Sequence, residues 1–99
     1  MSKYRNKLQI IADILVIVRN GSKKTHIMYQ ANLSYKLLRK YLDKVITAGL
    51  VKTENGDSYV LTGKGEEFLN RHEEYSKAHK RAQKERSILE TMFFTGDHQ

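Results

Sequence analysis

The chain has 99 residues, which suit one compact domain plus one extended element and leave little room for a second independent core. Its formal net charge of +7 makes a polyanion the natural partner. Because it contains no cysteine, disulfides and zinc sites built on thiolates are excluded, and stability must come from packing or oligomerisation. The absence of proline leaves long uninterrupted helices possible.

The positive charge is concentrated in the first half of the sequence. Residues 1–52 contain 11 lysines and arginines against 2 acidic residues, whereas residues 53–99 contain 7 against 9. The longest apolar stretch, Ile14–Val18, is far shorter than the roughly 20 residues of a membrane helix, and residues 1–7 lack the apolar core of a signal peptide. We therefore expect a cytoplasmic protein with no membrane partner, whose N-terminal half contacts phosphates.

Two helices are predicted before residue 33. Over Tyr4–Asn20, apolar residues recur at steps of three and four, which is typical of a helix with one apolar face. These apolar residues are Leu8, Ile11, Ile14, Leu15 and Val18. Gly21 ends this helix, and residues 21–24 are expected to form a polar turn. A short helix is predicted over Thr25–Gln30, which Asn32 interrupts.

A strongly amphipathic helix and a β-hairpin are predicted next. Ser34 is a good N-cap for the helix, and Ala48-Gly49 ends it. Its apolar face consists of Leu38, Tyr41, Leu42 and Val45, and its opposite face of Lys36, Arg39, Lys40, Asp43 and Thr47. Strands are expected over Leu50–Thr53 and Ser58–Leu61, because Asn55-Gly56 between them suits a tight turn with positive φ.

One long helix is predicted from Glu66 to about Phe94, a segment without any helix breaker. Thr62 indicates where this helix begins, and Gly63 and Gly65 are expected to make its first turn flexible. Four residues repeat every seven positions, as in a coiled coil: Phe68, Tyr75, Ala82 and Leu89. The helix would be about 45 Å long and needs a partner. We expect a second copy of the chain, the alternative being a helix that folds back onto its own domain.

The candidate dimer interface consists of residues from this helix, namely Phe68, Tyr75, Ala78, Ala82, Leu89, Met92 and Phe93. Leaving the large apolar residues near the chain end in water would be costly. Residues 95–99 are expected to form a flexible tail. Heptads alone do not decide between parallel and antiparallel pairing.

The order helix, short helix, helix, hairpin, helix is that of a winged helix-turn-helix. The sequence thus predicts a mainly α fold with a small β-hairpin, comprising a winged domain over residues 1–65 and a coiled-coil helix over residues 66–94. In such a fold the third helix can lie in a major groove with the hairpin beside it. The predicted DNA-binding residues are Lys23, Lys24, Thr25, Ser34, Tyr35, Lys36, Arg39, Lys40, Lys52, Asn55 and Ser58.

Signs of catalysis or of metal binding are poor. His72 and His79 are seven residues apart rather than four, and the carboxylates near them are scattered. The segment Gly63-Lys64-Gly65 lacks the rest of a phosphate-binding loop and follows a hairpin. We expect no enzymatic activity, no metal, no cofactor and no small-molecule substrate.

The run Lys24–Tyr35 (KTHIMYQANLSY) is more specific than a generic helix-turn-helix. Further matching residues are Tyr41-Leu42, Gly49-Leu50-Val51, Tyr59-Val60-Leu61-Thr62 and Lys64-Gly65. With these residues, the region from Lys7 to Leu69 resembles the archaeal winged-helix proteins of the Sulfolobus ten-a type, abundant small DNA-binding proteins of the chromosome. The resemblance implies an archaeal or archaeal-virus source, a recognition helix over Ser34–Ala48, a wing over Val51–Val60, and antiparallel pairing of two long C-terminal helices.

Together these observations predict a chromosome-associated homodimer that binds double-stranded DNA, mainly through phosphates and with low sequence specificity. A regulator of specific promoters is the alternative within DNA binding, and it would need base contacts from Lys36, Arg39 and Lys40. An alternative of another class is an interaction module in which the winged fold docks a protein. RNA binding also stays open.

Overall fold

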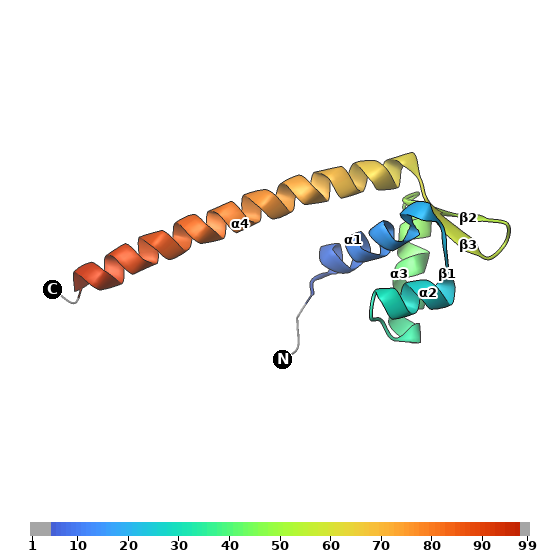
Figure 1. The fold of residues 1–99 in the computed structure, drawn as a ribbon, viewed down its shortest axis with the longest axis horizontal. Coiled ribbons are helices and arrows are strands. Elements are labelled where there is room, and N and C mark those ends of the chain that lie inside the picture. The colour runs from blue at the N-terminus through green and yellow to red at the C-terminus, as the bar shows by residue number, and fades with distance from the viewer. Residues whose placement is uncertain (1–4, 98–99) are drawn as a thin grey trace.

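The computed structural model describes residues 5–97, with side chains described as far as Phe94. The helices are α1 (Lys7–Ile17), the 3₁₀ turn η1 (Val18–Asn20), α2 (Lys24–Gln30), α3 (Tyr35–Thr47) and α4 (Gly63–Asp97). The strands are β1 (Ser22–Lys23), β2 (Val51–Glu54) and β3 (Ser58–Leu61). Figure 1 shows a compact lobe formed by α1, α2, α3 and the sheet, from which α4 projects as a rod. This architecture confirms the predicted mainly α winged helix-turn-helix with a long C-terminal helix.

Helix α1 is covered on two sides. It packs against α2 within the lobe and against the first turns of α4. Asn6 caps α1 by accepting a 2.8 Å hydrogen bond from the backbone N–H of Gln9, and Tyr4, the predicted start, lies outside the described residues. Ala12 is buried, whereas Leu8 is exposed, contrary to the expected apolar face. The face is shifted because α4 covers a second side of α1, which a single amphipathic stripe does not reveal.

The sheet has three antiparallel strands in the order β1-β3-β2, one more than the predicted hairpin. Ser22 pairs with Tyr59, and Lys23 pairs with Ser58. The expected polar turn over residues 21–24 is therefore wrong. Gly21, at a φ of 88°, redirects the chain from η1 onto the edge of β3. A two-residue strand is too short to show the alternation by which strands are recognised in a sequence.

Helix α3 and the hairpin agree with the prediction. Ser34 caps α3 by accepting a 3.2 Å hydrogen bond from the backbone N–H of Leu37. The buried residues of α3 are Leu38, Tyr41, Leu42 and Val45. Asn55 and Gly56 both have positive φ, at 54° and 85°, as a tight turn between β2 and β3 requires. The exposed side of α3 therefore points away from the core.

The entry into α4 is tightly packed. The Thr62 hydroxyl accepts a 3.0 Å hydrogen bond from the Gly65 N–H and donates a 2.6 Å hydrogen bond to the carbonyl of Gly49. A Cβ atom on Gly65 would overlap the carbonyl oxygen of Leu50 and lie 2.5 Å from Cδ1 of Leu61. The expectation that this glycine gives a flexible entry is wrong, because its missing side chain lets α4 approach the lobe closely.

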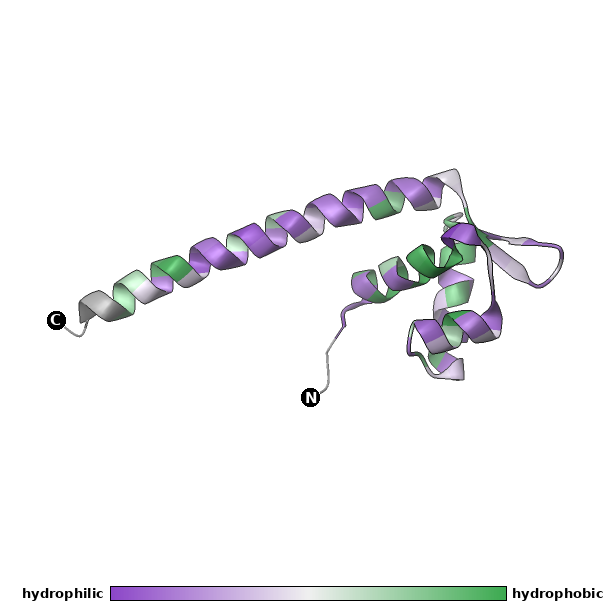
Figure 2. Cartoon of the chain, viewed as in Figure 1, coloured by the Kyte–Doolittle hydropathy of each residue, from purple (hydrophilic) through white to green (hydrophobic). Residues whose placement is uncertain are grey.

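The first turns of α4 belong to the lobe. Leu69 is buried in the core, Phe68 packs half-buried against it, and Glu66 forms a 2.7 Å ion pair with Arg19. All described side chains from residue 77 to Phe94 are exposed, and the middle of α4 is mostly hydrophilic (Figure 2). The helix continues to Asp97, three residues further than predicted, so the expected tail over residues 95–99 is helical as far as Asp97. Within residues 5–97, no helix has the length and apolar character needed to cross a membrane.

Candidate nucleic-acid interface

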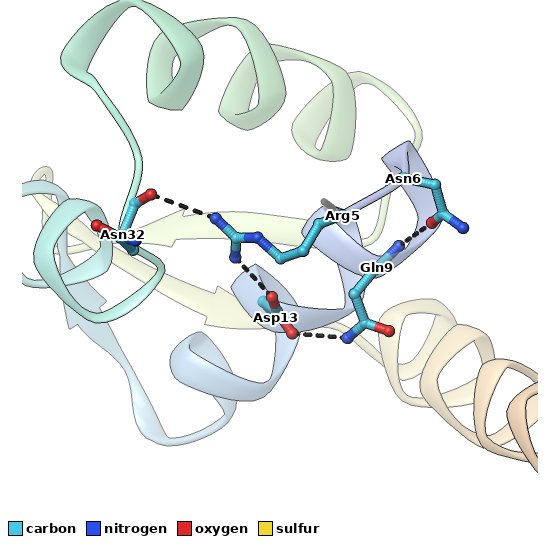
Figure 3. A network of polar contacts seen from close by, with 5 residues as sticks. All are labelled: Arg5, Asn6, Gln9, Asp13 and Asn32. Carbon is cyan, nitrogen blue, oxygen red and sulfur yellow. Dashed lines mark hydrogen bonds and ion pairs between the residues drawn. The ribbon is translucent and has the colours of Figure 1, made fainter. Parts of the chain in front are cut away.

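The turn between α2 and α3 is held by a polar network from the start of the chain (Figure 3). The guanidinium of Arg5 donates a 2.8 Å hydrogen bond to Asp13 on α1 and a 3.2 Å hydrogen bond to the backbone carbonyl of Asn32. Gln9 donates to the second carboxylate oxygen of Asp13 at 2.9 Å. Asn32 has a φ of 55°, a conformation that asparagine tolerates better than most residues. The network thus connects α1 to the turn that precedes α3.

The outward face of α3 carries the predicted cations. Lys36, Arg39 and Lys40 are exposed and border one shallow depression together with Tyr35 and Asp43. The buried residues of α3 anchor the helix, so these side chains project from a rigid element. A negative group, Asp43, lies at the C-terminal end of this depression, and the cations occupy the first turns of the helix.

Tyr35 brings cations from two helices together. The ammonium of Lys24, on α2, lies 5.8 Å from the ring centroid of Tyr35. The guanidinium carbon of Arg39, one turn further along α3, lies 6.0 Å from the same centroid. Both distances are within the range of a cation–π interaction. Tyr35 is therefore 55 % exposed and at the same time within reach of two cations.

The predicted DNA-binding residues fall into two groups in the structure. The helix group comprises Lys24, Thr25, Ser34, Tyr35, Lys36, Arg39 and Lys40, from α2, α3 and the turn before α3. The wing group comprises Lys23, Lys52, Asn55 and Ser58. Lys23 belongs with the wing because β1 pairs with β3, and its ammonium lies 3.7 Å from the carboxylate of Asp57. The Ser34 hydroxyl already caps α3.

Sequence reasoning missed two features of the winged lobe, the exposed Tyr29 and the contacts of Arg5. Tyr29, on α2, is 75 % exposed. Its position two residues after the buried Ile27 is the signal that could have found it, since such neighbours point to opposite sides of a helix. Arg5 was missed because its partners, Asp13 and Asn32, lie 8 and 27 residues away along the chain.

The candidate dimer-interface residues differ in their surroundings. Phe68 packs against its own lobe, so part of its surface is already covered. Leu89, Met92 and Phe93 are 65–68 % exposed at the far end of α4. Ala78 and Ala82 are exposed along the middle of α4.

Tyr75, another of these candidates, is 52 % exposed and lies between two histidine rings of α4. Its ring centroid is 6.2 Å from that of His72 and 6.0 Å from that of His79. The two histidines thus belong to a row of rings along the helix. In the part of the chain that the structure describes, no cluster of three metal-ligating side chains occurs.

Comparisons with known proteins agree with this architecture. The crystal structure of Sso10a-2, a DNA-binding protein from Sulfolobus solfataricus, matches with a TM-score of 0.78 and 27 % identity, covering 89 % of this chain and 96 % of that one. This match confirms the resemblance to the archaeal ten-a proteins. Two uncharacterized proteins of Methanocaldococcus jannaschii are also similar. MJ0290 is 42 % identical over 71 residues, and MJ0287 is 38 % identical over 67 residues.

The matched segments cover 71 % and 67 % of this chain, respectively. The chain spans only 33 % of the length of MJ0290 and 68 % of the length of MJ0287. A family model described as winged helix-turn-helix matches residues 4–80, from the N-terminus through the first half of α4. The chain therefore belongs to the winged helix-turn-helix family.

Proposed function

We propose that this protein binds double-stranded DNA, with the helix group in or along a major groove and the wing group on the adjacent backbone. The observation that carries the proposal is the basic face of α3. Lys36, Arg39 and Lys40 are exposed there, and none of the three forms an ion pair with a side chain of residues 5–94. The structural likeness to Sso10a-2, a DNA-binding protein, supports the same function.

The proposed mode is backbone binding with low sequence specificity, in a chromosome-associated role. Lysine and arginine neutralise phosphates regardless of sequence, and each such contact makes binding depend on salt. The wing group adds Lys52 and Asn55 from the hairpin. A regulator of specific promoters would instead need bidentate contacts from Arg39 or its neighbours to base edges. An interaction module would dock a protein on the same face.

We further propose that the protein acts as a homodimer paired antiparallel through α4, with one winged lobe at each end. The exposed Leu89, Met92 and Phe93 support pairing, because a second helix would remove their apolar surface from water. The exposed Ala78 and Ala82 would permit close approach of the helices midway along the pair. In this arrangement residues 66–94 form the coiled coil between the lobes.

The experiment that tests DNA binding is a fluorescence-anisotropy titration of random and selected duplex DNA over a salt series. The wild type is compared with Arg39→Ala/Lys40→Ala. The matched control is Arg71→Ala/Arg86→Ala, which loses the same charge from two arginines that Glu67 and Glu90 already pair with. We expect similar affinity for both DNAs, a steep loss with salt, and at least tenfold weaker binding of the Arg39/Lys40 variant only.

The other outcomes identify the alternatives. A selected site that binds hundreds of times more tightly than random DNA would replace the chromosome-associated role with promoter regulation. If neither DNA binds at moderate salt, the DNA proposal is wrong and the winged fold is a protein-docking module.

A further inference from the structure

The middle of α4 carries a strip of positive charge that the winged lobe does not explain. Lys77, Lys80, Arg81 and Lys84 are all exposed, and we name these four residues the rod strip. Residues 77–86 contain five basic residues against one acidic residue, although the second half of the chain is net negative. The net charge of residues 53–99 does not reveal the strip, because the acidic residues of α4 lie nearer the lobe, four of them between residues 66 and 74.

The rod strip lies on one side of α4, and its members Lys80 and Lys84 point away from Ala82 of the candidate dimer interface. Its spacings of three, four and seven residues place its members on one face of the helix. Ala82 is two residues from both Lys80 and Lys84, and residues two apart point to nearly opposite sides at about 100° per residue. A partner helix that covers Ala82 therefore leaves Lys80 and Lys84 in solvent, whereas Arg81, three residues after Ala78, borders the interface.

The helix itself pairs only one member of the rod strip. Lys77 lies 3.8 Å from Glu73 and 4.0 Å from Glu74, whereas Lys80, Arg81 and Lys84 make no ion pair among the residues that the structure describes. Each of the four residues has like-charged neighbours three or four positions away within the strip. Such pairs repel one another and destabilise a helix in the absence of a bound anion. The strip therefore favours an external polyanion as its partner.

We propose that the rod strip is a second binding site for the DNA backbone, separate from the winged lobe. Lys80 lies 17 residues beyond the start of α4, which places it about 26 Å along the rod. The strip is about 10 Å long, and B-DNA carries about six phosphate charges over that length. The proposal rests on the proposed function for the identity of the polyanion.

A duplex fits the strip better than an acidic protein segment does. The strip is straight, rigid and almost purely cationic, and it offers no apolar side chain that would anchor a peptide. A continuous line of phosphates meets such a surface without any requirement for register. Acidic protein partners are thus the competing occupants that the experiment has to distinguish.

The experiment compares the full-length wild type with Lys80→Ala/Lys84→Ala by anisotropy over a salt series, using a random-sequence duplex. Alanine retains the helix. The control is again Arg71→Ala/Arg86→Ala, with the same loss of charge from the same helix. Because both arginines lie on the side of α4 that carries the candidate dimer interface, affinities are compared only between forms that sedimentation shows to share one oligomeric state. We expect the Lys80/Lys84 variant to bind at least fivefold more weakly. We also expect the slope of log K against log salt to become shallower by about 0.9 for each lost phosphate contact.

The failure of this inference is distinguishable from failure of the proposed function. If Arg39→Ala/Lys40→Ala weakens binding but Lys80→Ala/Lys84→Ala matches the control in affinity and slope, the rod strip does not bind DNA, and an acidic protein becomes its candidate partner. If the control weakens binding as much as the Lys80/Lys84 variant, the effect is net charge alone and the site is rejected. If the wild type binds no duplex, both proposals are wrong.

Discussion

Gly65 lies directly against the backbone carbonyl of Leu50, so closely that a methyl group on Gly65 would overlap the carbonyl oxygen. This contact joins the start of α4 to the segment that leads into β2. Gly63, two residues earlier on the same helix, has no atom within 4 Å of the place where its Cβ would be. The two glycines therefore differ in the space available for a side chain, and alanine substitution at each position tests this difference.

We expect Gly65→Ala to destabilise the fold by about 1–3 kcal/mol, because backbone atoms must move to relieve the overlap. Gly63→Ala is the control and should be neutral or stabilising by up to about 1 kcal/mol, since alanine restricts the unfolded chain. Urea unfolding at one fixed chain concentration measures both values. Equal effects of the two substitutions would show that the close approach of α4 does not contribute to stability.

The Arg5–Asp13 ion pair is predicted to stabilise the turn before α3. Both side chains are partly buried, at 24 % and 31 % exposure, and Arg5 also donates to the carbonyl of Asn32. A double-mutant cycle with Arg5→Ala and Asp13→Ala should give a coupling energy of about 0.5–1 kcal/mol. Arg5→Lys should not restore the stability, because an ammonium lacks the planar fork that bridges two acceptors. Additive effects of the two alanine substitutions would contradict this account.

Tyr35 is predicted to act through its ring. Tyr35→Ala should weaken DNA binding about fivefold to tenfold, since Lys24 and Arg39 lose the aromatic face that holds them together. Tyr35→Phe retains that face and should bind within about twofold of the wild type. Anisotropy titrations at one salt concentration distinguish the two. If phenylalanine is as harmful as alanine, the hydroxyl contacts DNA directly and the positioning role is wrong.

The far end of α4 is predicted to hold the dimer together. Leu89→Ser/Phe93→Ser should convert the protein to a monomer by analytical ultracentrifugation, because it removes two large side chains from the proposed interface. Phe94→Ser is a demanding control, since Phe94 is also exposed and its ring lies 5.4 Å from that of Phe93 but points to another side of the helix. Retention of the dimer by the Leu89/Phe93 variant would place the interface elsewhere.

Local patterns predicted most of the fold. The amphipathic spacing of α3 identified its four buried residues, and Asn55-Gly56 identified the hairpin, because both signals lie within a few consecutive residues. The errors concern contacts between distant segments. Strand β1 depends on Tyr59, and the role of Gly65 depends on Leu50. No local sequence pattern indicates such contacts, because they form only when segments distant in the sequence pack together in the folded protein.

The candidate site shows the same division. The cations of α3 were predictable because they occupy the polar side of an amphipathic helix. That Lys24 and Arg39 would meet over one ring was not, since it depends on the angle between α2 and α3. The rod strip was missed for another reason. Charge summed over half of the chain averaged its lysines with the glutamates near the lobe.

Helix α4 runs without a break from Leu69, fixed in the core, to Phe93, exposed near its end. One element thus sets both the separation and the relative rotation of whatever is attached to its two ends. A single residue inserted near Lys84 would turn the distal part by about 100° and lengthen the helix by about 1.5 Å. In a paired molecule, the number of residues in α4 would therefore determine both the distance and the relative rotation between the two lobes. Seven-residue insertions would be tolerated far better than insertions of two or five.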